Sequence, residues 1–335
     1  MPHADLGERL PSRTQEWASA ECAAALAEWV AGEVGDLAVL EQVKLRVWAS
    51  VWAVETADRR FYLKQNCELQ SFEAALVQAL GEVAPDRVVP VAGADPDRGL
   101  LLTPDQGQVM AATVADDDVD AWCRVAAAAA ELQRAVAPHR DRLESLGLTT
   151  LPPADAPAYV ERRLEELVAL PADDPRRMPR ELHDAVCGRL LAVRDWAEQV
   201  ASLGLPVTLN HNDLHENNVF HVADELRFFD FADSLLTEPL GVLLIPLNVL
   251  AGRLGAGPDD PRLWRVADAA LEVWSDLAPM PALRAALPAA LRLARLGRVE
   301  CWARCCASMD DAELDEWGGA IPRWLAELVA DSPVG

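Results

Sequence analysis

The sequence predicts an α+β protein of two lobes, a small antiparallel-sheet lobe followed by a large, mainly helical lobe. Two observations carry this prediction. Strand patterns cluster before Thr103, and helical patterns dominate after it, with one short β interruption. We therefore place the boundary there, with an N-terminal lobe of residues 1–103 and a C-terminal lobe of residues 104–335. A chain of 335 residues is long enough for two such units.

The N-terminal lobe is expected to begin with a helix and to continue as a sheet. Apolar residues recur at helical spacing over residues 14–34, and Gly35 provides a stop. A second helix is predicted over residues 71–80. Apolar segments that alternate with polar residues or run together predict about five strands, which cover residues 43–47, 51–54, 61–64, 88–91 and 100–103. Short turns join most of them, so the sheet should be mostly antiparallel.

The C-terminal lobe is expected to be helical apart from its β interruption. Pro157 suits a first helical position, and the acidic run at residues 116–118 suits the start of a helix. Helices are predicted over residues 116–135, 157–167 and 181–203, and from residue 240 almost without a break to the end. The interruption comprises strands at residues 207–210, 219–222 and 226–229. A polar loop follows the first of these strands, and a turn follows the second.

Composition and charge disfavour some classes of partner and some cellular locations. The formal net charge of −24 disfavours a nucleic-acid partner, because phosphate backbones require a basic surface. No apolar run approaches the roughly 20 residues of a membrane span, and the first residues lack the pattern of a secretory signal. We therefore expect a cytoplasmic protein without a membrane or nucleic-acid partner. The seven cysteines have no paired CxxC spacing, which argues against a disulfide framework or a zinc site. Composition does not predict the oligomeric state.

Lysine is rare in this chain, and one lysine lies where a nucleotide would need it. Lys44 and Lys64 are the only lysines among 30 basic residues. Lys64 ends a predicted strand, and Glu73 lies in the helix that follows. A strand lysine that binds nucleotide phosphates and is held by a helix glutamate is a recurring kinase arrangement. Glu68 is a competing partner for Lys64. The alternative is an edge-strand lysine that blocks aggregation, with Glu73 an ordinary surface residue.

A polar loop inside the β interruption carries the residue types that phosphoryl transfer requires. It runs from His211 to Asn218, and Asp230 ends the second strand after it. Asp213 could accept or orient the proton of an attacking hydroxyl. Asn218 and Asp230 supply the hard oxygen atoms that Mg²⁺ prefers, and the hairpin between them would make them face each other. His211 and His215 are expected to brace the loop by hydrogen bonds. A surface loop with helix-capping residues is the structural alternative.

These motifs resemble those of the aminoglycoside phosphotransferase family, kinase-like enzymes that include antibiotic, choline and sugar kinases. The resemblance covers roughly residues 40–250 and rests on Leu63-Lys64, Phe72 to Leu76, Gly99 to Leu102, His211 to Asn218 and Asp230 to Asp233. The catalytic-loop segment is the specific one. The resemblance implies a bilobal protein-kinase-like fold with ATP or GTP in the cleft between the lobes. It also implies that Asp213 is the catalytic aspartate and that Asn218 and Asp230 are ligands of Mg²⁺.

The resemblance further assigns residues around the nucleotide. Thr103 and Asp105 would lie in the hinge that faces the base. Residues 48–52 would take the place of the phosphate-covering loop, with Ser50 as the expected contact. This segment has no glycine, unlike the Gly-rich loop of protein kinases, so it would cover the phosphates less closely. Gln133 stands where the family often has a histidine.

We therefore expect a magnesium-dependent phosphotransferase that moves the γ-phosphate of ATP or GTP to a hydroxyl of a small molecule. An aminoglycoside-like or other cationic compound is one option, which the acidic charge favours. The acceptor itself is not readable from the sequence. Its pocket should lie between the catalytic loop and the helices of the C-terminal lobe. Its acidic candidates, any of which could equally be solvated surface, are Asp233, Glu238, Asp310 and Asp311.

Two alternatives stay open. One is an enzyme of the same family that phosphorylates Ser or Thr of a biosynthetic peptide. A protein kinase proper is disfavoured, because a helical stretch opens at Pro239, where a long activation segment would be needed. The other is a nucleotide-binding pseudokinase, which would be expected to have lost Lys64, Asp213, Asn218 or Asp230. All four are present, and neither GxxxxGK[ST] nor GxGxxG occurs.

Overall fold

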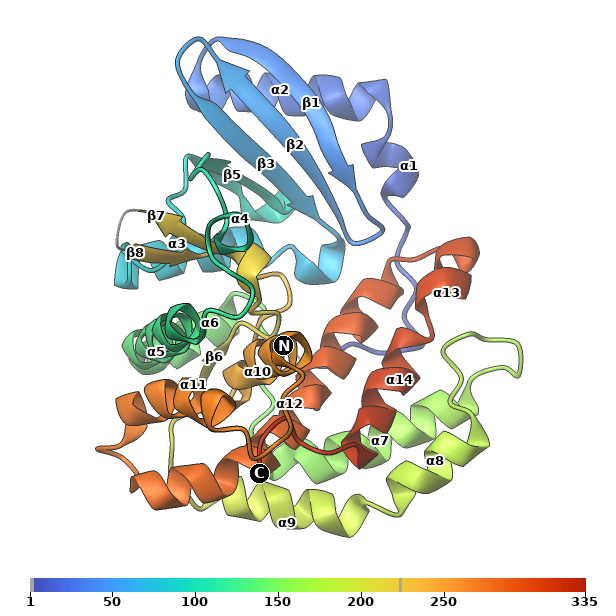
Figure 1. The fold of residues 1–335 in the computed structure, drawn as a ribbon. Coiled ribbons are helices and arrows are strands. Elements are labelled where there is room, and N and C mark those ends of the chain that lie inside the picture. The colour runs from blue at the N-terminus through green and yellow to red at the C-terminus, as the bar shows by residue number, and fades with distance from the viewer. Residues whose placement is uncertain (1–2, 223–224) are drawn as a thin grey trace.

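The computed structural model describes residues 3–222 and 225–335, which form two lobes (Figure 1). A five-stranded antiparallel sheet with flanking helices forms the N-terminal lobe, and the C-terminal lobe is largely helical. The predicted α+β fold class is confirmed. None of the helices in the described ranges has the length and apolar character that a transmembrane span requires.

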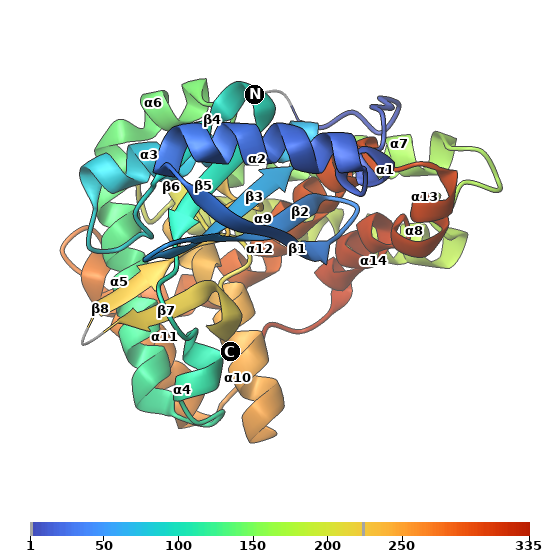
Figure 2. The ribbon, with the colours of Figure 1, turned by 90° about the horizontal axis from the view of Figure 1, so that it is seen from above.

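The sheet has the strand order β1-β2-β3-β5-β4, and every neighbouring pair is antiparallel. Its strands are β1 Leu37–Leu45, β2 Ala49–Thr56, β3 Arg60–Asn66, β4 Gly93–Asp95 and β5 Leu100–Pro104. Successive side chains of β2 point to opposite faces. Trp52 packs with Leu26 and Val30 of helix α2 (Ala20–Val34), which crosses the sheet in Figure 2. Val51 faces the cleft between the lobes.

The apolar segment at residues 88–91, predicted to be a strand, is not one. Its backbone bonds instead to the hairpin that follows the loop at residues 211–218. Val89 N–H donates to Phe228 O at 3.2 Å, and Phe228 N–H donates to Arg87 O at 2.8 Å. Pro90 has no N–H to extend a ladder. The strand that pairs with β5 begins only at Gly93.

The predicted helix over residues 14–34 is two helices, α1 Thr14–Trp17 and α2. The break lies at Ser19, whose Oγ accepts a hydrogen bond at 3.1 Å from a backbone N–H in the first turn of α2. Such an N-cap favours a new helix start over continuation of the first. α2 ends at Gly35 as predicted, with a φ of 85° that suits glycine.

The remaining helices confirm most of the predicted pattern. Asp118, the last residue of the acidic run, caps α5, and Pro157 lies in the first turn of α7. The predicted helix over residues 181–203 is divided, because Arg189 N–H bonds to Val186 O at 2.8 Å in a tighter turn. The helices are α3 Glu73–Val83, α4 Met110–Thr113, α5 Val119–Val136, α6 Arg140–Ser145, α7 Ala156–Ala169, α8 Arg180–Cys187, α9 Leu190–Ala201, α10 Leu244–Leu254, α11 Pro261–Leu271, α12 Met280–Ala307, α13 Asp311–Trp317 and α14 Ala320–Ala326.

The β interruption forms two small sheets. β7 Val219–Val222 and β8 Glu225–Phe228 form the predicted antiparallel hairpin, whose turn lies outside the described residues. β6 Thr208–Asn210 pairs with β9 Leu235–Thr237, a strand that the sequence patterns did not predict. These pairings return the chain that follows Asp230 to the start of the catalytic loop.

The lobes also meet at a tryptophan cluster beside the cleft, which Trp48 itself lines. Trp48, in the turn between β1 and β2, packs edge-on against Trp302 of α12 and Trp317 of α13, with ring centroids 5.5 Å and 5.2 Å apart. Trp302 and Trp317 stack on each other at 5.7 Å. A second connection comes from the N-terminal segment. Leu10 N–H donates to a carbonyl at the end of α12 at 2.7 Å, so residues 3–12 contact the C-terminal lobe.

Trp48→Ala should loosen the connection between the lobes. The substitution removes two edge-to-face ring contacts, each of which adds about 0.5–1.5 kcal/mol to the stabilisation from burial. We expect the free energy of unfolding in urea to fall by about 2 kcal/mol. Trp48→Phe keeps a ring and should recover most of this loss. A Trp48→Ala protein as stable as the wild type would show that the cluster does not stabilise the fold.

Candidate active site

A cleft with a volume of about 340 Å³ lies between the sheet and the β7–β8 hairpin. Apolar side chains line most of it, among them Val51 and Leu101. Phe220 stacks on Phe229 at one wall, with ring centroids 4.4 Å apart. Three ionic side chains form its polar end: Lys64, Glu73 and Asp230. An apolar slot with ionic groups at one end can take a planar ring that carries a charged tail.

Lys64 joins two carboxylates that belong to different parts of the chain. Its Nζ lies 2.7 Å from Glu73 Oε2 on α3 and 2.5 Å from Asp230 Oδ1 after β8. Glu68, the competing candidate, has no ion pair in the described ranges. Burial opposes the charged ammonium, but the charges of Asp230 and Glu73 outweigh burial and raise the pKa of Lys64 well above its usual range. Because an ammonium has three donors, one N–H remains for a ligand.

Glu73 also holds the chain that follows Asp230. Its Oε1 accepts a hydrogen bond from Phe231 N–H at 2.7 Å, and its Oε2 accepts one from Asn66 Nδ2 at 2.5 Å. Glu73 is fully buried, so its two oxygens find their partners in these donors and in Lys64 and not in water. α3 is thereby attached to the segment that carries Asp230.

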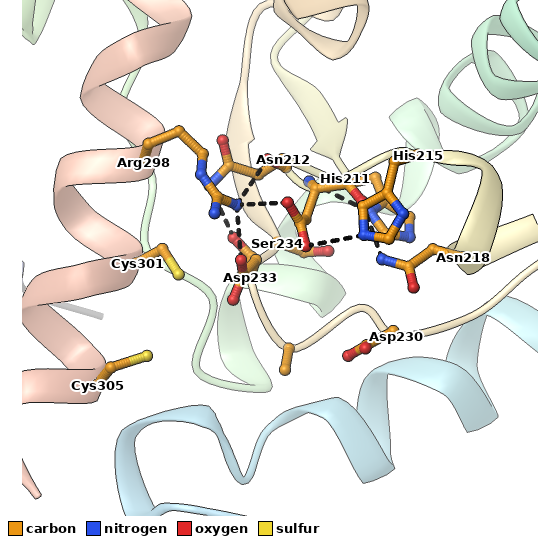
Figure 3. Close-up of polar contacts among 12 residues, drawn as sticks. His211, Asn212, His215, Asn218, Asp230, Asp233, Ser234, Arg298, Cys301 and Cys305 are labelled. Carbon is orange, nitrogen blue, oxygen red and sulfur yellow. Dashed lines mark hydrogen bonds and ion pairs between the residues drawn. The ribbon is translucent and has the colours of Figure 1, made fainter. Parts of the chain in front are cut away.

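The predicted catalytic loop, from His211 to Asn218, is braced by its histidines as expected (Figure 3). His211 Nδ1 accepts a hydrogen bond from Asp213 N–H at 3.4 Å, so its Nε2 carries the proton that is shared with Phe229 O at 2.9 Å. Burial lowers the pKa of His211, which keeps the ring neutral. His215 Nδ1 accepts a hydrogen bond from a backbone N–H two residues further on, at 3.2 Å.

Two residues of the site have a left-handed backbone. Asn212 has a φ of 65° and Asp230 a φ of 63°. Asn and Asp adopt this conformation more readily than other side chains, yet it still costs on the order of 1–3 kcal/mol. Hydrogen bonds nearby offset that cost, among them Asn212 Nδ2 to Asp233 O at 3.1 Å. The turn at Asp230 directs its carboxylate to Lys64.

Asp213 lies between the side chains of Arg298 and His215. Arg298 Nη1 is 3.0 Å from its Oδ1, and His215 Nε2 is 3.6 Å from its Oδ2. Burial alone would raise the pKa of Asp213. The nearby imidazole of His215 and the charge of Arg298 outweigh burial and lower this pKa to about 2. Asp213 is therefore ionised at neutral pH and can accept a hydrogen bond from a hydroxyl group.

Asn218 and Asp230 provide two oxygen ligands suited to a divalent cation. Phe229 N–H donates to Asn218 O at 3.3 Å, which brings the chain back as predicted. Asn218 Nδ2 donates to Asp213 O at 3.0 Å, so the amide oxygen is turned toward Asp230 (Figure 3). Asp230 bonds to Lys64 through Oδ1, and its other oxygen has no hydrogen bond within the described ranges.

This donor set fits Mg²⁺, which keeps several water or phosphate ligands and binds through one or two protein oxygens. The described residues contain no group of three or more His, Cys, Asp or Glu side chains that could hold a metal. An ion at Asn218 and Asp230 would therefore be shared with a bound ligand.

The expected nucleotide contacts need two corrections. Thr103 lines the cleft as expected, but Ser50 does not. The Ser50 side chain is fully buried on the other face of the sheet, where its Oγ accepts a hydrogen bond from Gln42 Nε2 at 2.9 Å. Because side chains alternate along a strand, Val51 faces the cleft instead. Asp105 is not among the residues that line the cleft either, and its Oδ1 accepts a hydrogen bond from the N–H of Gly107 at 2.9 Å.

Arg298 is the site residue that sequence reasoning missed. It lies on α12, about 80 residues beyond the catalytic loop, and its Nη1 is 2.7 Å from Asp233 Oδ2. Asp233, an expected acceptor-pocket residue, is thus committed to an ion pair. α12 carries several arginines, and nothing in their spacing distinguishes Arg298. Only the docking of the helix decides which of them reaches the loop.

No protein-family model matches this sequence, and no curated protein matches it. Solved structures do. A choline kinase from Cryptosporidium parvum Iowa II is similar with a TM-score of 0.60 and 10% identity, over 90% of this chain and 93% of that one. An ethanolamine kinase from Plasmodium vivax is similar with a TM-score of 0.57 and 11% identity, over 89% and 85% of the two chains. The fold is that of the choline and ethanolamine kinases.

A phosphotransferase of antibiotics has the same fold. A thermostable mutant of the aminoglycoside phosphotransferase APH(4)-Ia, in a ternary complex with AMP-PNP and hygromycin B, has a TM-score of 0.50 and 14% identity over 90% of this chain and 98% of that one. The expected protein-kinase-like, bilobal fold is confirmed. At these identities the likeness concerns the fold, and the activities named are those of the other proteins.

The other acidic candidates for an acceptor pocket have structural partners. Asp310 caps α13 in a reciprocal arrangement with Glu313, and Asp311 is an exposed residue whose Oδ1 lies 3.0 Å from Arg9 Nη2. Glu238 caps the short 3-10 helix Pro239–Leu243, and both of its oxygens accept backbone N–H groups, at 2.7 Å and 2.9 Å. These contacts account for all three side chains.

Glu238 should make the stability of the protein depend on pH. Burial raises the pKa of Glu238 from 4.5 to about 7, against the effect of the two backbone N–H groups. The folded protein then keeps a proton that the unfolded chain releases. The contribution of Glu238 to the free energy of unfolding is therefore fully present below about pH 4.5 and declines by about 3 kcal/mol as pH rises through about 7.

Glu238→Gln removes this titration but keeps an acceptor for the helix. The apparent Tm of the wild type relative to the variant should fall between about pH 5 and about pH 8. Thermal unfolding at several pH values measures this difference. A difference that stays constant across the range would show that Glu238 does not titrate there.

Proposed function

We propose that this protein is a magnesium-dependent phosphotransferase that moves the γ-phosphate of ATP or GTP to a hydroxyl of a small molecule. One observation carries the proposal. Lys64 and Asp230 are bonded to each other at the polar end of one cleft, and Asn218, which is bonded to the backbone of Asp213, lies next to Asp230. A carboxylate, two oxygen ligands and a free ammonium donor are the groups that phosphoryl transfer needs.

The nucleotide would bind between the N-terminal lobe, residues 1–103, and the C-terminal lobe, residues 104–335. Its base would occupy the apolar part of the cleft beside Thr103, and its phosphates would reach the free donor of Lys64. The complex of APH(4)-Ia with AMP-PNP, a protein of the same fold, supports a nucleotide as co-substrate. The acceptor would enter on the side of the C-terminal lobe, next to Asp213.

Asn218 and Asp230 would hold Mg²⁺, which when bound neutralises charge on the phosphate oxygens. Lys64 adds a donor for the phosphates, and its two carboxylate partners keep it in place. Asp213 is ionised and would accept a hydrogen bond from the acceptor hydroxyl, which aligns that oxygen for attack. Because the transition state of phosphoryl transfer is loose, alignment and charge neutralisation are the main contributions of the protein.

A small acceptor is favoured over a polypeptide. After Asp230 the chain enters β9 at Leu235 and a 3-10 helix at Pro239, which leaves no long segment for docking a protein. Choline kinase, ethanolamine kinase and the hygromycin B complex show that this fold serves small ligands in other proteins. A biosynthetic peptide would require an open docking surface next to Asp213, and the described residues give no indication of such a surface.

The proposal is tested by release of ADP from ATP, or GDP from GTP, with panels of aminoglycosides, amino alcohols, sugars and Ser/Thr peptides. Turnover with a member of the first three panels is expected, and it should require Mg²⁺. Turnover with peptides alone would identify a peptide kinase. Nucleotide binding without turnover on any panel would identify a pseudokinase. The absence of both binding and turnover would overturn the nucleotide proposal.

Asp213→Asn should abolish most transfer and leave nucleotide binding intact. The variant keeps the shape of the side chain but loses the charge that orients the hydroxyl. We expect kcat to fall by roughly 10²–10⁴, with the Kd of Mg-ATP unchanged in isothermal titration calorimetry. Wild-type turnover in this variant would remove Asp213 from the mechanism.

Glu73→Gln should weaken nucleotide binding. The change removes one of the two charges that hold Lys64, and a hydrogen bond to a charged group contributes about 1.5–3 kcal/mol. The Kd of Mg-ATP should therefore rise by about ten- to a hundredfold. Glu68→Gln is the matched control, because Glu68 is also close in sequence to Lys64 but does not pair with it, and it should bind like the wild type. Equal losses in the two variants would contradict the role of Glu73.

A further inference from the structure

Arg298 connects the candidate catalytic aspartate, Asp213, to a second carboxylate, that of Asp233, and Figure 3 shows Arg298 beside Asp233. Its side chain comes from α12 and is only 10% exposed. The Nη1 atom lies 3.0 Å from Asn212 O, 3.0 Å from Asp213 Oδ1 and 2.7 Å from Asp233 Oδ2. The Nη1 atom thus holds the loop backbone at Asn212, the side chain of Asp213 and, through Asp233, the segment that follows Asp230.

Asp233 is itself fixed from the opposite side. Its Oδ1 accepts a hydrogen bond from Gln70 Nε2 at 2.9 Å, while its Oδ2 binds Arg298. The orientation of the Gln70 amide follows from its oxygen, which accepts from the thiols of Cys67 at 3.4 Å and Cys305 at 3.5 Å. A continuous path of hydrogen bonds therefore leads from Gln70, before α3, through Asp233 and Arg298 to the catalytic loop.

The surroundings allow Arg298 little freedom. Its guanidinium lies over the ring of Trp324 on α14, 5.5 Å from the ring centroid. Without this cation, the carboxylates of Asp213 and Asp233, which both contact Nη1, would repel each other. Asp213 would then rotate away from Asp233. The charged Nη1 group contacts both carboxylates and determines the orientation of each.

A neighbouring arginine on the same helix provides a comparison. Arg295 is also buried, but it donates only to backbone carbonyls near the C-terminus, those of Glu327, Ala330 and Asp331. It has no carboxylate partner among the described residues and no contact with the catalytic loop. Arg295 shares the helix, the burial and the side chain of Arg298, and lacks its connection to Asp213.

We propose that Arg298 is a positioning residue that holds the Asp213 carboxylate in the orientation that aligns the acceptor hydroxyl, and that Asp233 and Gln70 hold Arg298 in turn. This inference rests on the proposed phosphotransferase function. Arg298 is assigned to act through Asp213, because its Nη1 contacts both carboxylates and the loop carbonyl.

The test compares Arg298→Met with Arg295→Met. ADP release is measured with the acceptor found in the screen and with water as acceptor. Arg298→Met should lower kcat by about 10- to 100-fold and leave KM for ATP within about threefold, because alignment is lost and nucleotide contacts are not. Arg295→Met should lower the apparent Tm by a similar amount and keep kcat near the wild-type value. Arg298→Lys, which restores a cation without the planar fork, should recover only part of the loss.

A double-mutant cycle separates positioning from a general structural effect. In the Asp213→Asn protein, Arg298→Met should change the residual kcat by less than about threefold, because the group on which Arg298 acts is already disabled. Losses that multiply in the double variant would overturn the inference. Asp233→Asn should give a partial loss that does not add to that of Arg298→Met.

A second measurement does not depend on turnover. Hydrogen exchange of the backbone amides of residues 211–218 should be faster in Arg298→Met than in the wild type and in Arg295→Met. Unchanged exchange would overturn the positioning role even in a protein that transfers phosphate. A wild-type protein that releases no ADP on any panel would instead overturn the phosphotransferase proposal, while the exchange result would still decide whether Arg298 positions the loop.

Discussion

The ammonium of Lys64 is the interaction on which the arrangement of the site depends. It extends from β3 and binds one carboxylate on α3 and another on the chain that follows β8, at 2.7 Å and 2.5 Å. A compact ammonium can serve two carboxylates and keep a third proton free, whereas the donors of a guanidinium are spread over a rigid plane. This geometry gives a reason for a lysine at this position in a chain that has arginine at every other basic position except Lys44.

The two cations of the site have the same role, because each binds two carboxylates. Lys64 binds Glu73 and Asp230, and Arg298 binds Asp213 and Asp233. Buried ion pairs contribute little net stability, because desolvation of the charges cancels most of the attraction. Their value here is geometric. Each cation brings carboxylates from separate segments to fixed places, and removal of one partner leaves an unpaired charge.

Side-chain packing holds the turn between β1 and β2 above the cleft. A glycine-rich loop in this place would instead bring its backbone close to a bound ligand. Trp48 lies at the end of that turn and contacts Trp302 and Trp317 of the other lobe. Backbone strain is present on the opposite side, where Asn212 and Asp230 have a left-handed backbone. Hydrogen bonds from the neighbouring chain offset it, and the strained turns direct side chains toward the cleft. Contacts with other parts of the chain therefore hold both sides of the cleft.

Local patterns in the sequence determined much of the site. The β7–β8 hairpin connects Asn218 to Asp230, so its register alone brings the two residues together. Lys64 and Glu73 are close in sequence, on a strand and the helix after it, and their pairing follows from that short connection. The end of α2 at Gly35 and the N-cap of α5 at Asp118 also depend only on neighbouring residues. Each of these features depends on residues within about a dozen positions of one another, where periodicity and turn chemistry decide the geometry.

Only the tertiary structure decided which faces and segments meet. Ser50 and Val51 both lie in an apolar strand, and the helix packed on the sheet determines that Ser50 is buried and Val51 faces the cleft. Residues 88–91 have the pattern of a strand, yet their partner is a hairpin of the other lobe. The role of Arg298 follows from the rotation and docking of α12, which the pattern of arginines along that helix leaves open. Contacts between distant segments depend on the packing of whole elements, and a residue pattern specifies only which side of each element is apolar.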